Sequence, residues 1–289
     1  MESLHADVPI MLRVHNSCRY LQDTLDMISN QSVPTKVYAF ACEPSPETRA
    51  ILDPYVEHIY TISQLTYDAW QFLNRCMEMV EEELIVFLDA DCTPVDVHWL
   101  VKLIEPCRKE QAGAAFSRKL PRSDAGPLIM NDLTASFGEH GKLLIANNRH
   151  AFSIESMVFR RSVWEEDRFP ENLGKWAPFV WTWNARRRGV KVVYSKYSRI
   201  LFIEPYTLRY WYKKTFDEGK VEAQVFSWDP KEKTRRSYFL KPWRRQVAED
   251  WRMAVNQRKI SGVLYSPVLR FVQYLGKYRG FRRTYKRRP

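Results

Sequence analysis

Two carboxylates that lie one residue apart are the side chains in this sequence best suited to chemistry. Asp89 and Asp91 flank Ala90 and follow directly on the apolar run of residues 84–88. That run is too short to cross a bilayer, so it predicts a buried strand that carries both acids to its carboxyl edge, where open α/β sheets bind ligands. Two aspartates at this spacing can hold a divalent cation against a diphosphate, which indicates nucleotide-sugar chemistry.

Two other interpretations of this D-x-D pair remain open. An Asp at the end of a strand often only caps the next helix. A phosphatase-type D-x-D uses its first Asp as the nucleophile, but that Asp usually opens the first strand of its domain. Asp89 follows several earlier predicted elements, which disfavours the phosphatase interpretation.

The elements that must position the pair alternate between strands and helices. Short apolar runs predict strands at residues 9–14, 36–42, 58–62, 84–89, 113–118, 156–160 and 190–194. Apolar residues at helical spacing predict helices at residues 20–28, 47–52, 67–82, 95–108 and 180–188. This alternation predicts a mostly parallel, doubly wound sheet. Beyond residue 119 we expect a long loop or lid, and from residue 206 onward a helical chain.

Composition indicates a globular protein. With 289 residues, 45% of them apolar, the chain can bury a full core. No segment resembles a signal peptide, and no apolar run approaches the roughly 20 residues that cross a bilayer, so we expect a cytoplasmic protein. Cys92 lies beside the D-x-D pair but has no obvious His partner in the sequence, so we discount it as a nucleophile. The five cysteines form no C-x-x-C pairs and predict neither a zinc site nor a disulfide framework: Cys18, Cys42, Cys76, Cys92 and Cys107.

The net charge of +11 is concentrated at one end of the chain. Residues 231–289 hold 18 of the 45 Lys and Arg residues but only 3 of the 34 Asp and Glu residues. The rest of the chain carries a small excess of acids. This basic segment predicts an anionic partner, which is a membrane surface, a nucleic acid or an acidic glycan.

Several short motifs occur in an order that is shared with a known family. They are residues 65–67 with Asn74, 119–125, 160–166, Trp181 with Gly189, and 206–208 with 213–214 and 216–219. From residue 8 to residue 226 the sequence resembles family 2 glycosyltransferases of the GT-A fold, in particular the bacterial rhamnosyltransferase-type branch. The resemblance implies a GT-A domain at residues 1–226, with a doubly wound, mostly parallel α/β sheet flanked by helices. It implies a basic, mainly helical extension at residues 227–289.

The resemblance also implies a reaction, the inverting transfer of a hexosyl or pentosyl group from a nucleotide-diphosphate sugar to an acceptor hydroxyl. The departing diphosphate gathers negative charge, which a bound Mn²⁺ or Mg²⁺ stabilises. Asp91 is then the first metal ligand, and Asp89 contacts the ribose or shares the ion. Lys213 or Lys214 adds positive charge near the phosphates.

Three further residues are assigned to the donor side by the same resemblance. Glu43 closes the second predicted strand where the family usually has an Asp that hydrogen-bonds the nucleotide base. Arg13, at the end of the first strand, is expected to join it. Asn74 is expected to make a polar contact with the donor.

The sequence departs from the family at the catalytic base. The family places Glu-Asp twelve and eleven residues before the Gly that ends the helix, and its Asp removes the acceptor's proton. Counting back from Gly189 reaches Ala177 and Pro178. A positioned base normally contributes a factor on the order of 10² to 10⁴, so we expect a substitute. Glu171 is the leading hypothesis, with Asp167 behind it.

A second departure concerns the metal shell. The family carries His-x-His before Tyr-Thr-Leu, and one His often completes the metal site, but here those positions hold Phe202 and Glu204. A carboxylate is a harder ligand than imidazole, so Glu204 could complete a site at Asp91 that favours Mg²⁺ or Mn²⁺.

Three interpretations remain open, two of them different acceptors and the third a domain without activity. Aromatic and basic residues mix over residues 266–289, which suits a helix lying in an anionic membrane interface and a lipid-linked or cell-envelope glycan as acceptor. The same composition suits DNA, as in phage-type enzymes that glycosylate a hydroxymethylated base. The missing Glu-Asp suits an inactive GT-A domain that only binds nucleotide sugar or glycan. We rank the envelope glycan first and expect either a cytoplasmic protein or one peripheral to the inner face of a membrane.

Overall fold

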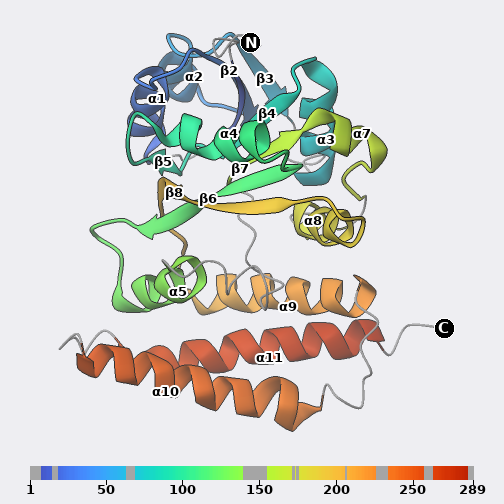
Figure 1. Ribbon diagram of the computed structural model, residues 1–289. Helices are drawn as coiled ribbons and strands as arrows, with labels where there is room; N and C mark the ends of the chain where they lie inside the picture. Colours follow the sequence, from blue (N-terminus) through green and yellow to red (C-terminus); the bar gives the residue numbers. More distant parts are fainter. Residues whose placement is uncertain are drawn as a thin grey trace. The chain divides into compact units, whose positions relative to one another are not determined.

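The computed structural model describes residues 8–14, 19–62, 69–138, 155–170, 173, 176–205, 207–225, 234–256 and 263–285. The chain divides into two compact units (Figure 1). The first unit comprises Met1–Arg122 and Ser136–Ile203, and the second comprises Ser123–Ala135 and Glu204–Pro289. The predicted boundary between residues 226 and 227 lies outside the described residues, in the part of the chain that belongs to the second unit.

A single sheet organises the first unit. Its described strands are β1 (Val8–Val14), β2 (Thr35–Cys42), β3 (His58–Ile62), β4 (Leu84–Asp89), β5 (Thr93–Pro94), β6 (Ala114–Pro121), β7 (Ser156–Arg160) and β8 (Val192–Phe202). Their order across the sheet is β3-β2-β1-β4-β7-β6-β8-β5. The seven predicted strands are confirmed, because each is a short apolar run with strong strand propensity.

The sheet is mixed in direction. Strands β3, β2, β1 and β4 are parallel, as the sequence predicts. Strand β7 lies antiparallel between β4 and β6, and β5 is antiparallel to β8, while β6 and β8 are parallel. The α/β class is confirmed, and the insertion of β7 brings the start of that strand, residue 156, beside the end of β4.

Helices pack on this sheet through apolar faces. They are α1 (Leu21–Ser29), α2 (Pro46–Leu52), α3 (Ala69–Met79), α4 (Trp99–Lys109), α7 (Arg161–Glu166) and α8 (Ala177–Arg187). Trp99, Trp164 and Trp181 are completely or almost completely buried and anchor α4, α7 and α8 in the core. The predicted helices are confirmed with ends that differ by a few residues.

The predicted loop beyond residue 119 is wrong for its first part. Strand β6 continues to Pro121 because its backbone pairs with β8, and helix α5 (Pro127–Phe137) follows. Residues 139–154 lie outside the described residues.

The second unit is helical. Besides residues 123–135, which include most of α5, its described elements are α9 (Leu208–Val225), a π-helical turn at Arg236–Leu240, α10 (Lys241–Asn256) and α11 (Ser266–Tyr285). Figure 1 shows α9 and α11 side by side. None of the described helices combines the length and apolar character needed to cross a membrane.

Glycines let α9 and α11 approach closely. A Cβ atom on Gly280 of α11 would lie 2.0 Å from the Phe216 carbonyl oxygen, and one on Gly219 of α9 would lie 2.1 Å from the Lys277 carbonyl oxygen. Neither separation is sterically possible, so both positions require glycine for this packing. Helix α11 is therefore a core helix of the second unit.

Two ion clusters are built into the helices of this unit. The Arg270 guanidinium, 3% exposed, donates to Asp250 and to Asp132 at distances from 2.6 to 3.0 Å. The Lys277 ammonium forms ion pairs with Glu218 at 2.5 Å and with Glu222 at 2.8 Å. Burial alone would lower the pKa of Lys277, but these two carboxylates raise it well above its usual value, so the lysine stays charged.

Candidate active site

The D-x-D pair lies in a tight turn at the carboxyl edge of the parallel strands. Strand β4 ends at Asp89, and the amide N–H of Ala90 donates to the Arg13 carbonyl at 2.9 Å. The Thr24 hydroxyl donates to the Ala90 carbonyl at 2.9 Å, and the Cys92 amide donates to the Asp89 carbonyl at 2.8 Å. These backbone contacts hold both carboxylates at the edge where the sequence predicts them.

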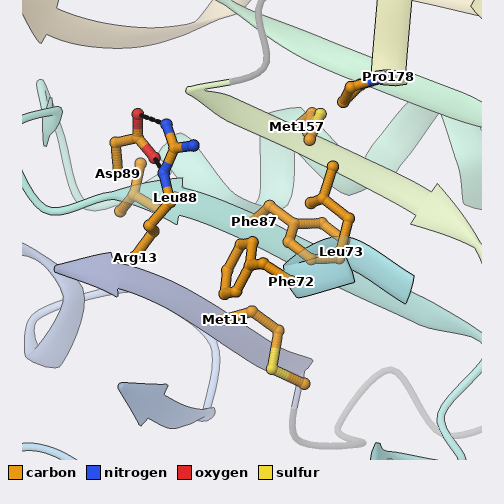
Figure 2. Close-up of a pocket in the computed structure, with 9 residues that line it drawn as sticks. All are labelled: Met11, Arg13, Phe72, Leu73, Phe87, Leu88, Asp89, Met157 and Pro178. Atoms are coloured by element: carbon orange, nitrogen blue, oxygen red, sulfur yellow. Dashed lines mark hydrogen bonds and ion pairs between the residues drawn. The ribbon is translucent and has the colours of Figure 1, made fainter. Parts of the chain in front are cut away.

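Asp89 is fixed by an arginine from the neighbouring strand. Arg13 on β1 is the register partner of Asp89 on β4. Its Nε donates to Asp89 Oδ1 at 2.6 Å, and its Nη2 contacts Oδ2, as Figure 2 shows. Both side chains are mostly buried, and this bidentate geometry is the strong form of an Arg–carboxylate pair. The pair thus fixes the orientation of the Asp89 carboxylate.

A carboxylate and a lysine beside Asp89 were not predicted as site residues. The amide N–H of Asp89 donates to the Glu155 carbonyl at 2.9 Å, which places Glu155, the residue just before β7, next to Asp89. Lys119 on β6 is 8% exposed, lies 2.6 Å from Glu155 Oε2, and holds its Nζ 4.2 Å from the centre of the Phe202 ring. Charged residues therefore follow one another across four strands, in the order Arg13, Asp89, Glu155 and Lys119.

Asp91 stands in a different environment from Asp89. Its carbonyl accepts a hydrogen bond from Arg122 Nη2 at 3.1 Å, and the same atom donates to Thr93 Oγ1 at 2.7 Å. The Arg122 guanidinium is packed 3.4 Å from the centre of the Tyr20 ring. Within the described part of the chain no hydrogen bond or ion pair reaches the Asp91 carboxylate, which is half-buried. That carboxylate can therefore accept a cation.

The donor atoms at this edge fit a divalent ion held together with a substrate. Among the described residues no group of three or more His, Cys, Asp or Glu side chains is arranged to hold a metal. Mg²⁺ and ions like it are commonly bound by one or two carboxylates, with water and substrate phosphates completing the shell. Asp91, with Asp89 beside it, meets that requirement.

A pocket opens beside the pair. It is lined by Met11, Arg13, Phe72, Leu73, Phe87, Leu88, Asp89, Met157 and Pro178. Its charged lining residues are Arg13 and Asp89, and its walls are apolar (Figure 2). Pro178 is one of the two residues that replace the family's Glu-Asp. Helix α8 therefore begins at the pocket without bringing a carboxylate there.

Of the two candidates for the substitute base, Asp167 is among the described residues and does not line this pocket. Glu171 lies outside the described residues, so its role stays a prediction. Asp167 forms an ion pair with Arg188, and its carbonyl accepts a hydrogen bond from Trp181 Nε1. These contacts tie the segment after α7 to α8.

Glu43 adopts an unusual backbone conformation at the same edge of the sheet. It follows β2, its side chain is exposed, and its φ is +44°, in the left-handed region that non-glycine residues rarely enter. Its amide donates to the Ile62 carbonyl of β3 at 3.2 Å. Such conformations cost of order 1–3 kcal/mol and cluster at functional sites, which supports the predicted donor contact without testing it.

Asn74 has a structural task. Its Oδ1 accepts hydrogen bonds from Trp164 Nε1 at 2.9 Å and from the Phe169 amide at 3.1 Å. Its Nδ2 donates to the Phe169 carbonyl at 3.1 Å. Asn74 thus holds the segment after α7 against α3, and the predicted contact with the donor stays a prediction.

Three further predicted site residues belong to the second unit. The Glu204 carboxylate accepts a hydrogen bond from the Tyr210 hydroxyl at 2.6 Å and forms an ion pair with Lys214. Lys214 also lies 4.6 Å from the centre of the Trp211 ring, while Lys213 is exposed. Glu204 as a metal ligand and the two lysines as phosphate contacts stay predictions.

Cys92 is a core residue. It is completely buried, and burial raises the pKa of its thiol well above the usual value, with Asp89 and Glu155 adding to the effect. A thiol in this state is protonated and unreactive, in agreement with its dismissal as a nucleophile.

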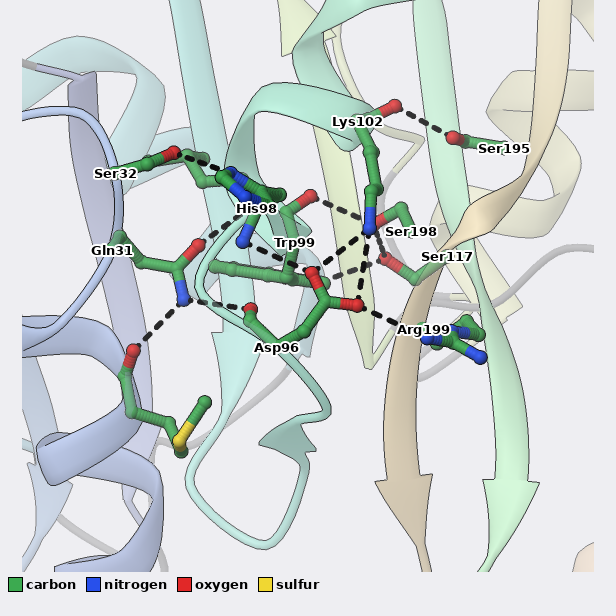
Figure 3. A network of polar contacts seen from close by, with 12 residues as sticks. Gln31, Ser32, Asp96, His98, Trp99, Lys102, Ser117, Ser195, Ser198 and Arg199 are labelled. Atoms are coloured by element: carbon green, nitrogen blue, oxygen red, sulfur yellow. Dashed lines mark hydrogen bonds and ion pairs between the residues drawn. The ribbon is translucent and has the colours of Figure 1, made fainter.

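The loop after the D-x-D pair is anchored by a polar network (Figure 3). The Asp96 carboxylate accepts hydrogen bonds from Lys102 Nζ at 2.9 Å, Arg199 Nη2 at 3.2 Å and the His98 amide at 3.0 Å. Trp99 Nε1 donates to Ser117 at 3.1 Å, in a buried cluster of hydroxyl groups. The network joins α4 to β6 and β8.

This network predicts a dependence of stability on pH. Burial alone would raise the pKa of Asp96, but its hydrogen bonds with Lys102, Arg199 and His98 lower it below the usual value of about 3.9. Asp96 therefore stabilises the fold above that value and loses its contribution as the pH falls through its lowered pKa. We expect Asp96→Asn to melt at a lower temperature than the wild type near neutral pH and to lose less stability on acidification.

The check is thermal unfolding followed at a series of pH values. Glu105→Gln is the matched control, because it removes an exposed partner of Lys109 and should give a curve close to the wild type. Parallel curves for Asp96→Asn and the wild type would contradict this account.

Comparisons with solved structures agree with this architecture. A mannosyltransferase, PcManGT from Pyrobaculum calidifontis in complex with GDP-Man and Mn²⁺, is 13% identical, with a TM-score of 0.58 over 91% of this chain and 74% of that chain. S. aureus TarS 1–349 is 14% identical, with a TM-score of 0.55 over 97% and 90% of the two chains. The chain has the GT-A fold.

A third similar structure is glucosyl-3-phosphoglycerate synthase from Mycobacterium tuberculosis, in complex with Mn²⁺, UDP and glucosyl-3-phosphoglycerate. It is 14% identical, with a TM-score of 0.54 over 76% of this chain and 79% of that chain. No protein-family model matches the sequence, and comparison with curated protein sequences gives no match. At these identities the likeness establishes the GT-A fold alone.

Proposed function

We propose that this protein is a metal-dependent glycosyltransferase that transfers a sugar, with inversion, from a nucleotide-diphosphate sugar to an acceptor hydroxyl. The observation that carries the proposal is the D-x-D turn, in which Arg13 holds Asp89 while the Asp91 carboxylate is left open to a cation. Solved GT-A structures that contain Mn²⁺ with GDP-Man or UDP support the same interpretation.

The two carboxylates have separate tasks in this proposal. Asp91 is the principal ligand of a Mn²⁺ or Mg²⁺ ion, which when bound neutralises charge that develops on the departing diphosphate. Asp89, held by Arg13, contacts the ribose or shares the ion. Arg13 already contacts both carboxylate oxygens of Asp89. Asp91 therefore supplies most of the negative charge that attracts the metal ion.

The donor is recognised along the same edge of the sheet. Glu43 hydrogen-bonds the nucleotide base from its left-handed position at the end of β2.

The acceptor's proton requires a base that α8 does not supply. We assign that task to Glu171, and Glu171→Gln should then reduce transfer by about 10²-fold or more while donor affinity stays within about twofold. The measurement is nucleoside diphosphate release with acceptor present, paired with calorimetric titration of the donor. Glu166→Gln, an exposed acid near the end of α7, is the matched control.

The same assay distinguishes Glu171 from Glu155. Unchanged turnover in Glu171→Gln would remove it as the base. Loss of turnover in Glu155→Gln alone would then move the role to the carboxylate beside Asp89.

The acceptor that we favour is a cell-envelope or lipid-linked glycan, with the enzyme in the cytoplasm or at the inner face of a membrane. The excess of cations in residues 231–289 supports an anionic surface as the partner of this segment. Duplex DNA with hydroxymethylated bases is the second candidate, because phosphates attract the same cations. Donor binding without turnover on any acceptor would indicate a binding domain.

A further inference from the structure

Exposed apolar side chains gather in one part of the second unit. Of the seven large hydrophobic residues that are exposed among the described residues, five lie between residues 255 and 271. Leu264 is 63% exposed, Val255 57% and Val268 51%. The set, called the apolar patch below, comprises Val255, Leu264, Tyr265, Val268 and Phe271. Such a concentration marks an interaction surface more often than a scatter of single residues does.

Helix geometry places the patch on the outward side of α11. Val268 and Phe271 are three residues apart and share one face of the helix. Its buried residues include Leu269, Gln273 and Gly276, which lie on the other side. The Phe271 ring also packs against Trp243 of α10, with ring centres 5.8 Å apart, so the patch is continuous with α10.

Cations flank the patch along both helices. On α11, Arg279 is exposed and follows Val268 by eleven residues, which is about three turns and returns it to the same face. Helix α11 contains no acid, and of its five Lys or Arg residues two, Arg270 and Lys277, are held in the ion clusters, which leaves Arg279, Arg282 and Arg283. On α10, Arg252 is exposed and lies three residues before Val255, with exposed Arg244 two turns further back.

We propose that this surface docks on an anionic lipid bilayer. The patch would enter the boundary between headgroups and acyl chains, and the flanking arginines would contact lipid phosphates. Its aliphatic members favour lipid over nucleic acid, because Leu264, Val255 and Val268 have no π-face to stack on a base and no group that can hydrogen-bond one. Docking itself is independent of the transfer reaction, whereas its use in bringing the enzyme to a lipid-linked acceptor rests on the proposed function.

This proposal is narrower than the prediction from the sequence, in which the whole of residues 266–289 suits a helix lying in a membrane interface. Gly276, Gly280 and Phe281 are buried in the second unit, so this side of α11 cannot face lipid. Among the described residues of these two helices, the outward ones near the start of α11 and at the end of α10 remain for the bilayer.

Co-sedimentation of the full-length chain with vesicles tests the proposal. Vesicles of phosphatidylcholine with roughly one third phosphatidylglycerol should bind the protein well, and pure phosphatidylcholine vesicles should bind it weakly. The double variant Leu264→Glu with Val268→Glu should lower the vesicle partition coefficient at least about tenfold, because it places two carboxylates in the bilayer interface. The matched control is Val97→Glu with Tyr197→Glu, which changes exposed hydrophobic residues of the first unit and should leave binding unchanged.

The outcomes separate docking from the other interpretations. Absence of vesicle binding, or equal binding by the double variant, would overturn the proposal. Loss of duplex DNA binding in the double variant, with vesicle binding unchanged, would assign the surface to nucleic acid instead. Thermal unfolding checks that both variants are folded, and nucleoside diphosphate release with a soluble acceptor reports the reaction separately. A wild type that binds vesicles but releases no diphosphate would retain the docking surface and fail the proposed function.

Discussion

Replacing Asp91 with Asn is expected to lower metal-dependent turnover of the nucleotide sugar by roughly 10²- to 10³-fold, with little change in stability. Its carboxylate is open to a cation within the described structure, so the substitution removes a metal ligand without breaking an ion pair. Charge stabilisation by a metal is worth several kcal/mol, and each 1.36 kcal/mol is a factor of ten in rate. The measurement is nucleoside diphosphate release across a titration of Mn²⁺.

Two comparisons make this prediction specific. Asp53→Asn removes an exposed acid at the end of α2 and should behave as the wild type. Asp89→Asn should lower both turnover and melting temperature, because it breaks the bidentate contact with Arg13. Wild-type turnover and Mn²⁺ dependence in Asp91→Asn would exclude Asp91 as the metal ligand.

Replacing Gly280 with Ala is expected to destabilise the second unit by about 3 kcal/mol or more. The added Cβ would lie 2.0 Å from the Phe216 carbonyl oxygen and 2.8 Å from its carbonyl carbon. Overpacking of this kind typically costs about 1–3 kcal/mol, and here the obstacle is helix backbone, which cannot move aside as a flexible side chain can. Helices α9 and α11 must separate to accept it.

Denaturant unfolding of the full chain measures this effect. Gly126→Ala is the matched control, since nothing lies within 4 Å of the Cβ that it adds and its φ is not positive. Gly219→Ala, whose Cβ would meet the Lys277 carbonyl oxygen, should resemble Gly280→Ala. If Gly280→Ala unfolded at the same denaturant concentration as Gly126→Ala, the close packing of α9 on α11 would be wrong.

The parallel half of the sheet and the position of the D-x-D pair were predictable because their signals are local. A buried strand such as β4 reads as a short apolar run, and the acids that follow it must emerge at its carboxyl edge. The same reasoning placed Arg13 and Glu43 at that edge. It did not indicate that Arg13 and Asp89 form a pair, because register between strands depends on tertiary structure.

The less predictable part of the site depends on contacts between distant segments. Glu155 lies beside Asp89 only because β7 is inserted antiparallel between β4 and β6, and Lys119 reaches Glu155 only because β6 extends to Pro121. The sequence offered the motif that contains Lys119 but no sign of its partner. Asn74 could not be recognised as structural, because its partners Trp164 and Phe169 lie about ninety residues further along.

The C-terminal helices show the same limit. The mixture of aromatic and basic residues in α11 predicts a helix at a membrane surface, but the pattern cannot reveal that Gly276 and Gly280 face the backbone of α9. Once the structure assigns that face to the core, the exposed hydrophobic side chains near residues 264–271 can be recognised as a small separate surface.

The most direct test of the proposed glycosyltransferase is nucleoside diphosphate release from a panel of nucleotide sugars with Mn²⁺. The acceptors compared are a lipid-linked saccharide extract, hydroxymethylated duplex DNA and no acceptor, with Asp91→Ala as the inactive control. We expect release from one donor that is stimulated by the lipid-linked saccharides and lost in the variant. Stimulation by the DNA alone would make hydroxymethylated DNA the acceptor in place of the glycan. Absence of release with every donor and acceptor would contradict the proposed glycosyltransferase activity.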